Sequence, residues 1–470
     1  MKNSLISEHR CLSFAMKFHN RENELEQLNR IEGLSREQFF FLRITGRRRI
    51  GKTELIREWI QGQRSKVLYF YVTRQNEATL LSEFKQILAQ EYPEYRSVEF
   101  AGMSQFIQTL FDVHIRHHVI TIFDEFQEFQ WQANDPFSII QKELDQRLGK
   151  MKGLLVAVGS LQSMMTRLFD DAKQPLFGRL NASLHCTSFT PRSLEKLFDE
   201  HGVDIHNRLD LYTVFHGIPF YYKLINDYQL WNKSIFDIIG RLVLDKNSIL
   251  VDEGRQLLLS EFGKNYAPWF SILKAVSSGS TRLSEIVNQS GVPMENINRY
   301  LNELIRYYQI IERRQPLGAE PKGKISRYYI SDRFIEFWFR FVYRYQSMLE
   351  IGASAALLGN IERDFAAYQG KIFEEYCKEL LIEQNQNGIV SFDEIGSWWD
   401  RGTTEIDIIT INHRLKTIVM YECKLQGKRY KLPELQAKAS RFIDSQKQLR
   451  SYGLSFKMLG ADQWAELQAG

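Results

Sequence analysis

The N-terminal part of the chain contains short runs of apolar side chains, and stretches with helical spacing separate most of them. The apolar runs span residues 39–44, 66–73, 119–123, 153–160 and 184–191. Continuous apolar runs of this length are typical of parallel strands that are covered on both faces. Their alternation with helical patterns predicts a doubly covered α/β sheet.

The pattern changes in the middle of the chain, where helical stretches are followed by strand-like pieces. The helical patterns span residues 267–278, 281–291 and 292–310, and the strand-like pieces span residues 310–314 and 326–331. Three helices followed by a β-hairpin predict a winged helix-turn-helix. On that fold the third helix would face the major groove of DNA. The excess of basic side chains in this region is modest, so DNA contact and a purely scaffolding role both stay open.

The C-terminal part begins with a helix rich in aromatic side chains, residues 332–346, which at helical spacing are expected to form core. A further helix over residues 370–381 and two strands over residues 404–411 and 417–425 follow. These patterns divide the chain into an α/β core, a segment that follows the core, a winged helix and a C-terminal α/β domain. The predicted boundaries are 15–205, 206–260, 261–335 and 336–470.

Composition sets limits on the class of protein. A chain of 470 residues with 44% hydrophobic and 25% charged side chains is expected to fold into several globular domains. The net charge of +4 permits nucleic-acid binding but does not argue for it. The four cysteines lack CxxC spacing, which indicates neither a disulfide framework nor a zinc site. No apolar run approaches the length of a membrane span, so we expect a cytoplasmic protein without a membrane partner.

The stretch "ITGRRRIGKTELI" at residues 44–56 contains the spacing G-x-x-x-x-G-K-T. Its glycines would let backbone N–H groups turn toward phosphates, and the following helix would direct its positive end at the same anion. Lys52 would reach the β/γ oxygens, and the Thr53 hydroxyl would contact Mg²⁺. The predicted nucleotide-binding residues here are Gly46, Arg47, Arg48, Arg49, Ile50, Gly51, Lys52, Thr53 and Glu54.

An acidic pair, Asp124 and Glu125, ends the apolar run at residues 119–123. In a P-loop protein the Asp at this place holds Mg²⁺, and the following carboxylate can act as general base for the attacking water. The alternative is a plain helix cap. Ser160, at the end of another strand-like run, is a candidate for facing the γ-phosphate, with a strand-ending turn as the alternative.

The residues "FHNRENELEQL" at 18–28 resemble the F-x-x-R-E-x-E-L box that precedes the P-loop in archaeal-type ATPases, a group related to the AAA+ and signal-transduction NTPases. The resemblance continues through GRRRIGKT, IFDEFQEF, VGSLQSMM, PLFGRL and HGIPFYY. It implies ATP and Mg²⁺ as cofactors, and it places Asn20 and Arg21 near the adenine. The alternative makes Asn20 an ordinary helix N-cap, followed by Glu22 and Glu24 as solvated first-turn residues.

Arg179 in PLFGRL is, by the same resemblance, a candidate for stabilising charge on the γ-phosphoryl group. The alternative is a surface arginine that pairs with Asp170 or Asp171. Whether Arg179 acts within its own subunit or across a homo-oligomer stays open.

The C-terminal strands carry the second group of candidate residues. Asp407 lies on one strand, Glu422 and Lys424 share a face of the next, and Glu374 lies on the preceding helix. This arrangement resembles that of PD-(D/E)xK nucleases, and it predicts metal binding by Asp407 and Glu422. The alternative is a surface hairpin with an ordinary solvated pair. The region, including "IGSWWDRG", also resembles the domain of unknown function that follows archaeal-type ATPases.

Together these observations predict an α/β multidomain protein with a P-loop ATPase core, a helical lid, a winged helix-turn-helix and a nuclease-like C-terminal domain. We expect ATP with Mg²⁺ to switch the relation between the core and the C-terminal parts, with DNA as a candidate partner. Two alternatives stay open: an ATP-gated metal-dependent nuclease, and an interaction switch whose nuclease-like tail is catalytically dead.

Overall fold

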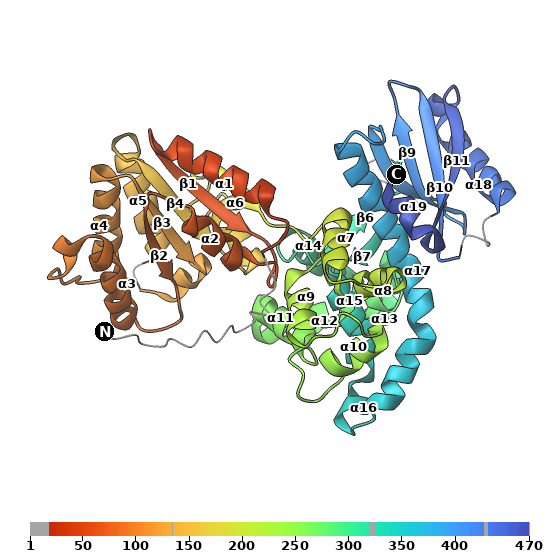
Figure 1. Cartoon of the computed structure of the whole chain (residues 1–470), viewed down its shortest axis with the longest axis horizontal. Coiled ribbons are helices and arrows are strands. Elements are labelled where there is room, and N and C mark those ends of the chain that lie inside the picture. The colour runs from red at the N-terminus through yellow and green to blue at the C-terminus, as the bar shows by residue number, and fades with distance from the viewer. Residues whose placement is uncertain (1–17, 134, 320–324, 427–430, 470) are drawn as a thin grey trace, which may run out of the picture.

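A computed structural model describes residues 18–133, 135–319, 325–426 and 431–469 of the chain. The N-terminal region is a parallel five-stranded sheet in the order β2-β3-β4-β1-β5, with helices on both sides (Figure 1). Its strands are β1 (Phe39–Thr45), β2 (Lys66–Tyr71), β3 (Val119–Asp124), β4 (Gly153–Val158) and β5 (Ala182–His185). Its helices are α1 (Glu22–Ser35), α2 (Lys52–Gln61), α3 (Glu77–Glu91), α4 (Met103–Arg116), α5 (Pro136–Arg147) and α6 (Gln162–Asp170). The predicted α/β sheet is therefore confirmed.

The two faces of this sheet belong to different hydrophobic clusters. Leu42 and Ile122 pack on one face with residues from the rest of the chain. Phe41, Phe70 and Phe123 pack on the other face, against α3 and α4 among others. Every residue of β3 and of β4 is buried, as expected for strands covered on both sides.

Helices α7 (Pro191–Glu200), α8 (Ile205–Phe215), α9 (Pro219–Asp227), α10 (Ile235–Leu242) and α11 (Glu253–Phe262) follow the sheet. We refer to α8–α11 as the lid helices. The turn between α8 and α9 passes so close to Phe189 that a Cβ on Gly217 would lie 2.2 Å from the Phe189 carbonyl oxygen. Glycine is therefore required where the lid helices approach the strand region.

The predicted three helices and hairpin are present as α12 (Ala267–Ser277), α13 (Leu283–Ser290), α14 (Met294–Arg306) and the antiparallel pair β6 (Ile311–Arg314) and β7 (Arg327–Ile330). The aromatic-rich segment after them is a short α-helix, α15 (Arg333–Phe337), which continues as a π-helical turn, Trp338–Val342. Phe334, Phe337 and Trp338 are almost fully buried, so the prediction that these aromatics form core is confirmed.

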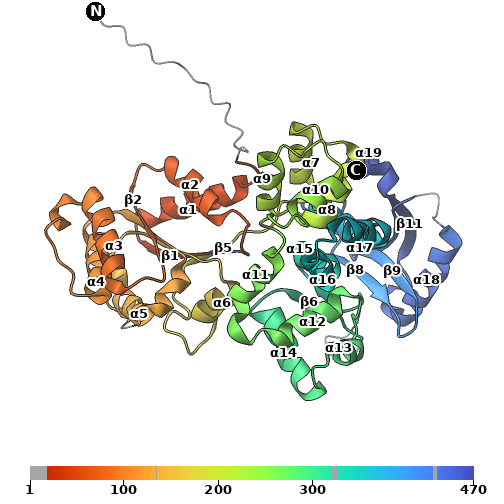
Figure 2. The same cartoon turned by 90° about the horizontal axis from the view of Figure 1, so that it is seen from below.

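The C-terminal region contains α16 (Gln346–Glu350), α17 (Ser354–Gln386), α18 (Leu432–Ser445), α19 (Trp464–Ala469) and a four-stranded mixed sheet. The sheet has the order β11-β10-β9-β8, with β8 (Glu394–Trp399), β9 (Glu405–Asn412), β10 (Thr417–Lys424) and β11 (Gly453–Gly460). The long helix α17 runs from α16 past the lid helices to this sheet (Figures 1 and 2). In the described part of the chain, no helix combines the length and the apolar character that crossing a membrane requires.

Candidate functional site

The loop between β1 and α2 turns sharply before the helix begins at Lys52. Arg49 and Gly51 adopt left-handed backbone angles, with φ of 70° and 88°. A Cβ on Gly46 would lie 2.6 Å from the carbonyl oxygen of Cys186, so only glycine fits at the start of the loop. The loop thus has the curled backbone and the helix start that phosphate binding requires.

Lys52 is buried inside this loop. Its Nζ donates to the carbonyl oxygens of Gly46, at 2.7 Å, and Arg47, at 3.1 Å. Burial lowers the pKa of Lys52 to about 8, although the carboxylate of Glu125 opposes the shift. A buried cation held by neutral carbonyl groups is a favourable place for an anion, because a phosphate would supply the missing countercharge.

Thr53 and Asp124 meet at the mouth of the loop. The Thr53 hydroxyl donates to Asp124 Oδ2 at 3.1 Å, and the Tyr69 hydroxyl donates to the same oxygen at 2.6 Å. Burial, with the charge of Asp124, raises the pKa of Tyr69 and keeps its hydroxyl a donor. A hydroxyl and a buried carboxylate are oxygen ligands that suit Mg²⁺, which takes its remaining ligands from water and phosphate. The donor set therefore fits the predicted magnesium ion.

Glu125 lies beside this pair but is held by two neighbours. Ser160 Oγ donates to Glu125 Oε2 at 2.7 Å, and the Gln127 amide also donates to the carboxylate. Glu125 itself adopts a left-handed conformation, φ 55°, at the end of β3. The structure therefore brings the predicted Glu125 and Ser160 into direct contact.

A cavity of about 860 Å³ opens next to these residues. Lys52, Thr53, Asp124, Glu125 and Ser160 all line it. Of the predicted nucleotide-binding residues, the cavity is also lined by Arg21, Arg48, Arg49, Ile50, Gly51 and Glu54. Gly46, Arg47 and Asn20 are not among its lining residues. The cavity is large enough for a nucleotide-sized ligand.

Arg21 lines the cavity and also forms hydrogen bonds that connect separate segments of the chain. Its guanidinium donates to the carbonyl oxygens of Ile50, at 3.0 Å, and Thr187, at 2.8 Å. Arg21 also occupies the N-cap position of α1, which begins at Glu22. The alternative in which Asn20 caps this helix is therefore wrong, because the helix starts one residue later than that alternative requires.

Arg179 lies away from the cavity of this chain. Its guanidinium forms two bonds to Asp145, with Nη2 2.9 Å from Oδ2. The predicted alternative, a surface ion pair, correctly describes its surroundings but names the wrong partner, because Asp170 pairs with Arg43 instead.

Several residues near the phosphate loop were not predicted from the sequence. The Arg49 guanidinium stacks on Phe220, 4.0 Å from the ring centroid, and pairs with Glu253. Arg47 pairs with Asp332. Tyr69 and Gln127 position Asp124 and Glu125. The contacts of Arg47 and Arg49 have no local motif, since each joins the loop to a residue distant in sequence.

The C-terminal candidate residues are close to one another. Asp407 Oδ2 accepts a hydrogen bond from the Cys423 amide at 2.8 Å. Burial and the charge of Glu422 raise the pKa of Asp407 to about 6. Burial, with the charge of Asp407, raises the pKa of Glu374 well above its usual value. The structure therefore places the predicted carboxylates in one electrostatically coupled group on α17, β9 and β10.

Two lysines form ion pairs with Glu422, one of the carboxylates of this group. Glu422 Oε1 lies 2.7 Å from Lys424 Nζ, and Glu422 Oε2 lies 3.1 Å from Lys438 Nζ. Across the described ranges, no group of three or more His, Cys, Asp or Glu side chains could hold a metal ion. Two lysines therefore already pair with the oxygens of Glu422, and the predicted metal binding by Asp407 and Glu422 stays a prediction.

Comparison with known proteins gives two family matches. Residues 18–217 match a family described as an ATPase domain predominantly from Archaea. Residues 338–438 match a family described as "Archaea bacterial proteins of unknown function". The chain is 31% identical over 411 residues to the uncharacterized protein MJECL04 of Methanocaldococcus jannaschii, and the match covers 87% of each chain.

The fold is similar to solved structures of P-loop ATPases. The Walker-type ATPase PABY2304 of Pyrococcus abyssi aligns with a TM-score of 0.52 and 17% identity, over 69% of this chain and 96% of that chain. The ORC2 protein of Aeropyrum pernix aligns with a TM-score of 0.42 and 14% identity, over 72% and 96%. At 17% identity the likeness to PABY2304 concerns the fold alone.

Proposed function

This chain belongs to the family of ATPases found predominantly in Archaea, and from that premise we propose that Lys52, Thr53 and Asp124 bind ATP with Mg²⁺ and that Glu125 activates water. The observation that carries this proposal is a hydrogen bond beside the loop that encloses Lys52. In it the Thr53 hydroxyl donates to Asp124 Oδ2 at 3.1 Å. The residues proposed for phosphate, metal and water thus come from two separate segments, residues 52–53 and 124–125, and line one cavity.

The residues of the chain have distinct roles in this proposal. Lys52 leaves its two loop carbonyls and neutralises charge on the γ-phosphate. Thr53 and Asp124 would hold Mg²⁺, which supplies charge stabilisation when it is bound. Glu125 accepts a proton from the attacking water. In the present structure Ser160 and Gln127 hold Glu125, which favours a resting state in which the base is not yet aligned.

Two substitutions separate binding from hydrolysis. Lys52→Ala should remove most of the affinity for ATP, because it deletes the cation inside the loop. Glu125→Gln should retain ATP binding and reduce turnover by about 10²–10⁴-fold, since Gln keeps the shape but accepts no proton. Nucleotide titration and phosphate-release assays measure the two effects. Hydrolysis by Glu125→Gln at the wild-type rate would show that Glu125 is not the base.

We propose further that nucleotide state is coupled to the C-terminal half, where DNA contact is a candidate. The exposed face of α14 is available for it, with Arg299 and Arg306 exposed. The hairpin is less available, because it packs on the C-terminal sheet. Leu317 N donates to Ser397 O at 2.8 Å, and Trp399 Nε1 donates to Ile325 O at 3.0 Å. This packing favours a scaffolding role for the hairpin itself.

A second candidate function is cleavage of a phosphodiester by the C-terminal domain. It is favoured by the proximity of Asp407, Glu422 and Lys424, and it is opposed by Lys438, which also pairs with Glu422. A cleavage assay on single- and double-stranded DNA, with wild type and Asp407→Ala in parallel, decides between the alternatives. Cleavage lost in Asp407→Ala supports the nuclease. Equal absence of cleavage in both, with salt-dependent DNA binding retained, supports a tail that only binds.

A further inference from the structure

Two arginines of the phosphate loop pair with carboxylates from distant parts of the chain. Arg49 forms two bonds to Glu253 at the start of α11, at 2.9 and 3.0 Å. Arg47 forms an ion pair with Asp332, which lies between β7 and α15. Both carboxylates are almost completely buried. The loop that should receive phosphate therefore already holds two anions that belong to the protein.

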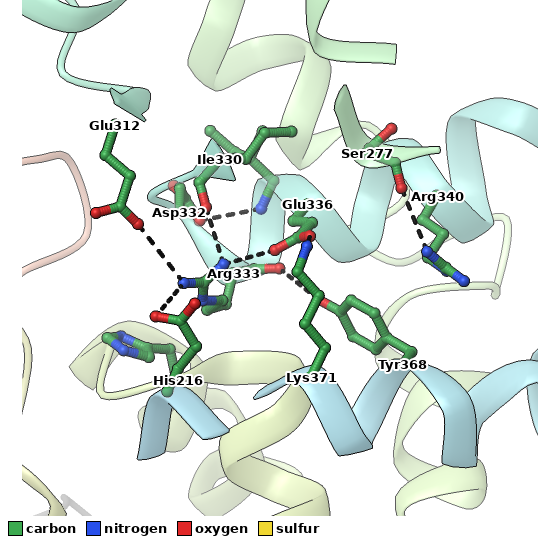
Figure 3. A network of polar contacts seen from close by, with 12 residues as sticks. His216, Ser277, Glu312, Ile330, Asp332, Arg333, Glu336, Arg340, Tyr368 and Lys371 are labelled. Carbon is green, nitrogen blue, oxygen red and sulfur yellow. Dashed lines mark hydrogen bonds and ion pairs between the residues drawn. The ribbon is translucent and has the colours of Figure 1, made fainter. Parts of the chain in front are cut away.

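Asp332 has a different partner on each oxygen. Oδ2 pairs with Arg47, and Oδ1 accepts the Ile335 amide at 3.0 Å as the N-cap of α15. The next residue, Arg333, is also buried and donates to Ile330 O, at 2.9 Å, and Glu336 Oε2, at 2.7 Å (Figure 3). The ion pair to the loop thus joins directly onto the start of α15.

The contacts of Arg333 continue to α17. Arg333 Nη2 lies 3.1 Å from Glu375 Oε2, and Lys371 Nζ lies 3.1 Å from Glu336 Oε1. Burial acts in the opposite direction, but Arg333 and Arg314 lower the pKa of Glu375 to about 2. The network is therefore charged at neutral pH. It connects the phosphate loop, α15 and the long helix that leads to the C-terminal sheet.

Phosphate in the loop would act on Arg47 through the loop backbone, because Arg47 does not line the nucleotide cavity. Lys52 donates to the Arg47 carbonyl oxygen at 3.1 Å, and a phosphate would draw the Lys52 ammonium away from it. The backbone that carries the Arg47 side chain would then lose a hydrogen bond that fixes its position, which would weaken the contact between Arg47 and Asp332.

We propose that the ion pair between Arg47 and Asp332 is controlled by nucleotide: ATP in the phosphate loop releases Arg47 from Asp332 and so frees α15 and its network from the ATPase core. This inference rests on the proposed function, because it needs ATP in the loop. By linkage, a contact that ATP breaks must itself weaken ATP binding. The ion pair therefore stabilises the position that α15 and its network take relative to the ATPase core in the absence of nucleotide.

The test uses Asp332→Asn in the full chain. Asn keeps an oxygen that caps α15 but removes the negative charge that pairs with Arg47. We expect the Kd for a non-hydrolysable ATP analogue to fall about tenfold, within the range typical of coupled sites. Asp204 caps α8 by accepting the His206 amide at 2.9 Å. Asp204→Asn therefore removes the same charge from another helix start and should leave the Kd unchanged.

Hydrogen exchange of wild type provides a readout that needs no variant. Adding the analogue should raise amide exchange in residues 331–342, and Asp332→Asn should show raised exchange there without nucleotide. An unchanged Kd in Asp332→Asn together with unchanged exchange in wild type, in a protein that binds the analogue, would overturn this inference alone. Failure of wild type to bind the analogue would overturn the proposed function and this inference with it.

Discussion

Neighbouring arginines on β6 show how the position of a single residue decides its role. Strand geometry places Arg313 and Arg314 on opposite faces. Arg313 is exposed and donates to Ser326 Oγ at 2.8 Å. Arg314 points inward, where its Nη2 lies 2.6 Å from Glu375 Oε2. The sequence shows both as basic residues of a region for which DNA contact and scaffolding both stay open. The structure engages the guanidinium of Arg314 within the protein.

This difference predicts unequal effects on stability. Arg314→Ala should lower the free energy of unfolding by about 3 kcal/mol, because it leaves the buried Glu375 carboxylate without one of its partners. Arg313→Ala should change it by less than about 0.5 kcal/mol, as is usual for an exposed side chain. Denaturant unfolding of the two variants measures both values under the same conditions. Equal effects would mean that Arg314 does not stabilise Glu375.

The nucleotide-site residues differ in how far the sequence could place them. Lys52 and Thr53 follow from one short motif, because consecutive residues fix the loop and the start of the helix. Asp124 follows from its place at a strand end, since parallel strands end at the same edge of a sheet. Asp332 and Glu253 have no local signature. Their contacts with the loop depend on how the lid helices and α15 dock, which is a property of the whole chain.

At the scale of elements, regular segments with clear periodicity were predicted well. Strands β1–β4, helices α12–α14 and strands β6, β7, β9 and β10 form close to the predicted ranges. Strand β5 (Ala182–His185) lies earlier than the predicted run at residues 184–191. The segment 332–346 was predicted as one helix but contains α, π and 3-10 turns. Its aromatic side chains pack on several neighbours, including Phe270 against Phe339. Tertiary packing therefore overrides the regular helical period there.

The strands β8 and β11 were not predicted. In β8 the register with β9 shifts between Gly396 and Trp398, so the strand lacks the simple alternation that a sequence pattern would show. In β11 most side chains are exposed or intermediate, and its pairing with β10 joins residues 36 positions apart, such as Thr417 and Gly453. Such pairing depends on docking rather than on local preference.

At the scale of the whole molecule, the parts of the chain share one hydrophobic cluster. It extends from Leu42 of the parallel sheet through Tyr212 and Phe334 to Phe373 and Ile408. Helix α17 contributes the largest continuous share of this cluster in the C-terminal half. Its buried apolar residues include Leu357, Ile361, Phe365, Tyr368, Ile372 and Tyr376. The predicted four-part division stays a prediction, and the shared cluster packs residues of all these parts against one another.

This packing predicts that removing α17 and the residues after it destabilises the lid helices. A chain ending at Gly352, in an exposed turn before α17, should unfold at a markedly lower temperature than the full chain and bind ATP poorly. Each fully buried apolar side chain that it loses contributes about 1.5–3 kcal/mol, and the total stability of a domain is about 5–15 kcal/mol.

Co-expression of residues 353–470 as a separate chain should restore both the midpoint and ATP binding, because the same surfaces can pack again. Thermal unfolding and nucleotide titration of both preparations measure this. A shortened chain with the midpoint and ATP affinity of the full protein would show that α17 does not stabilise the lid.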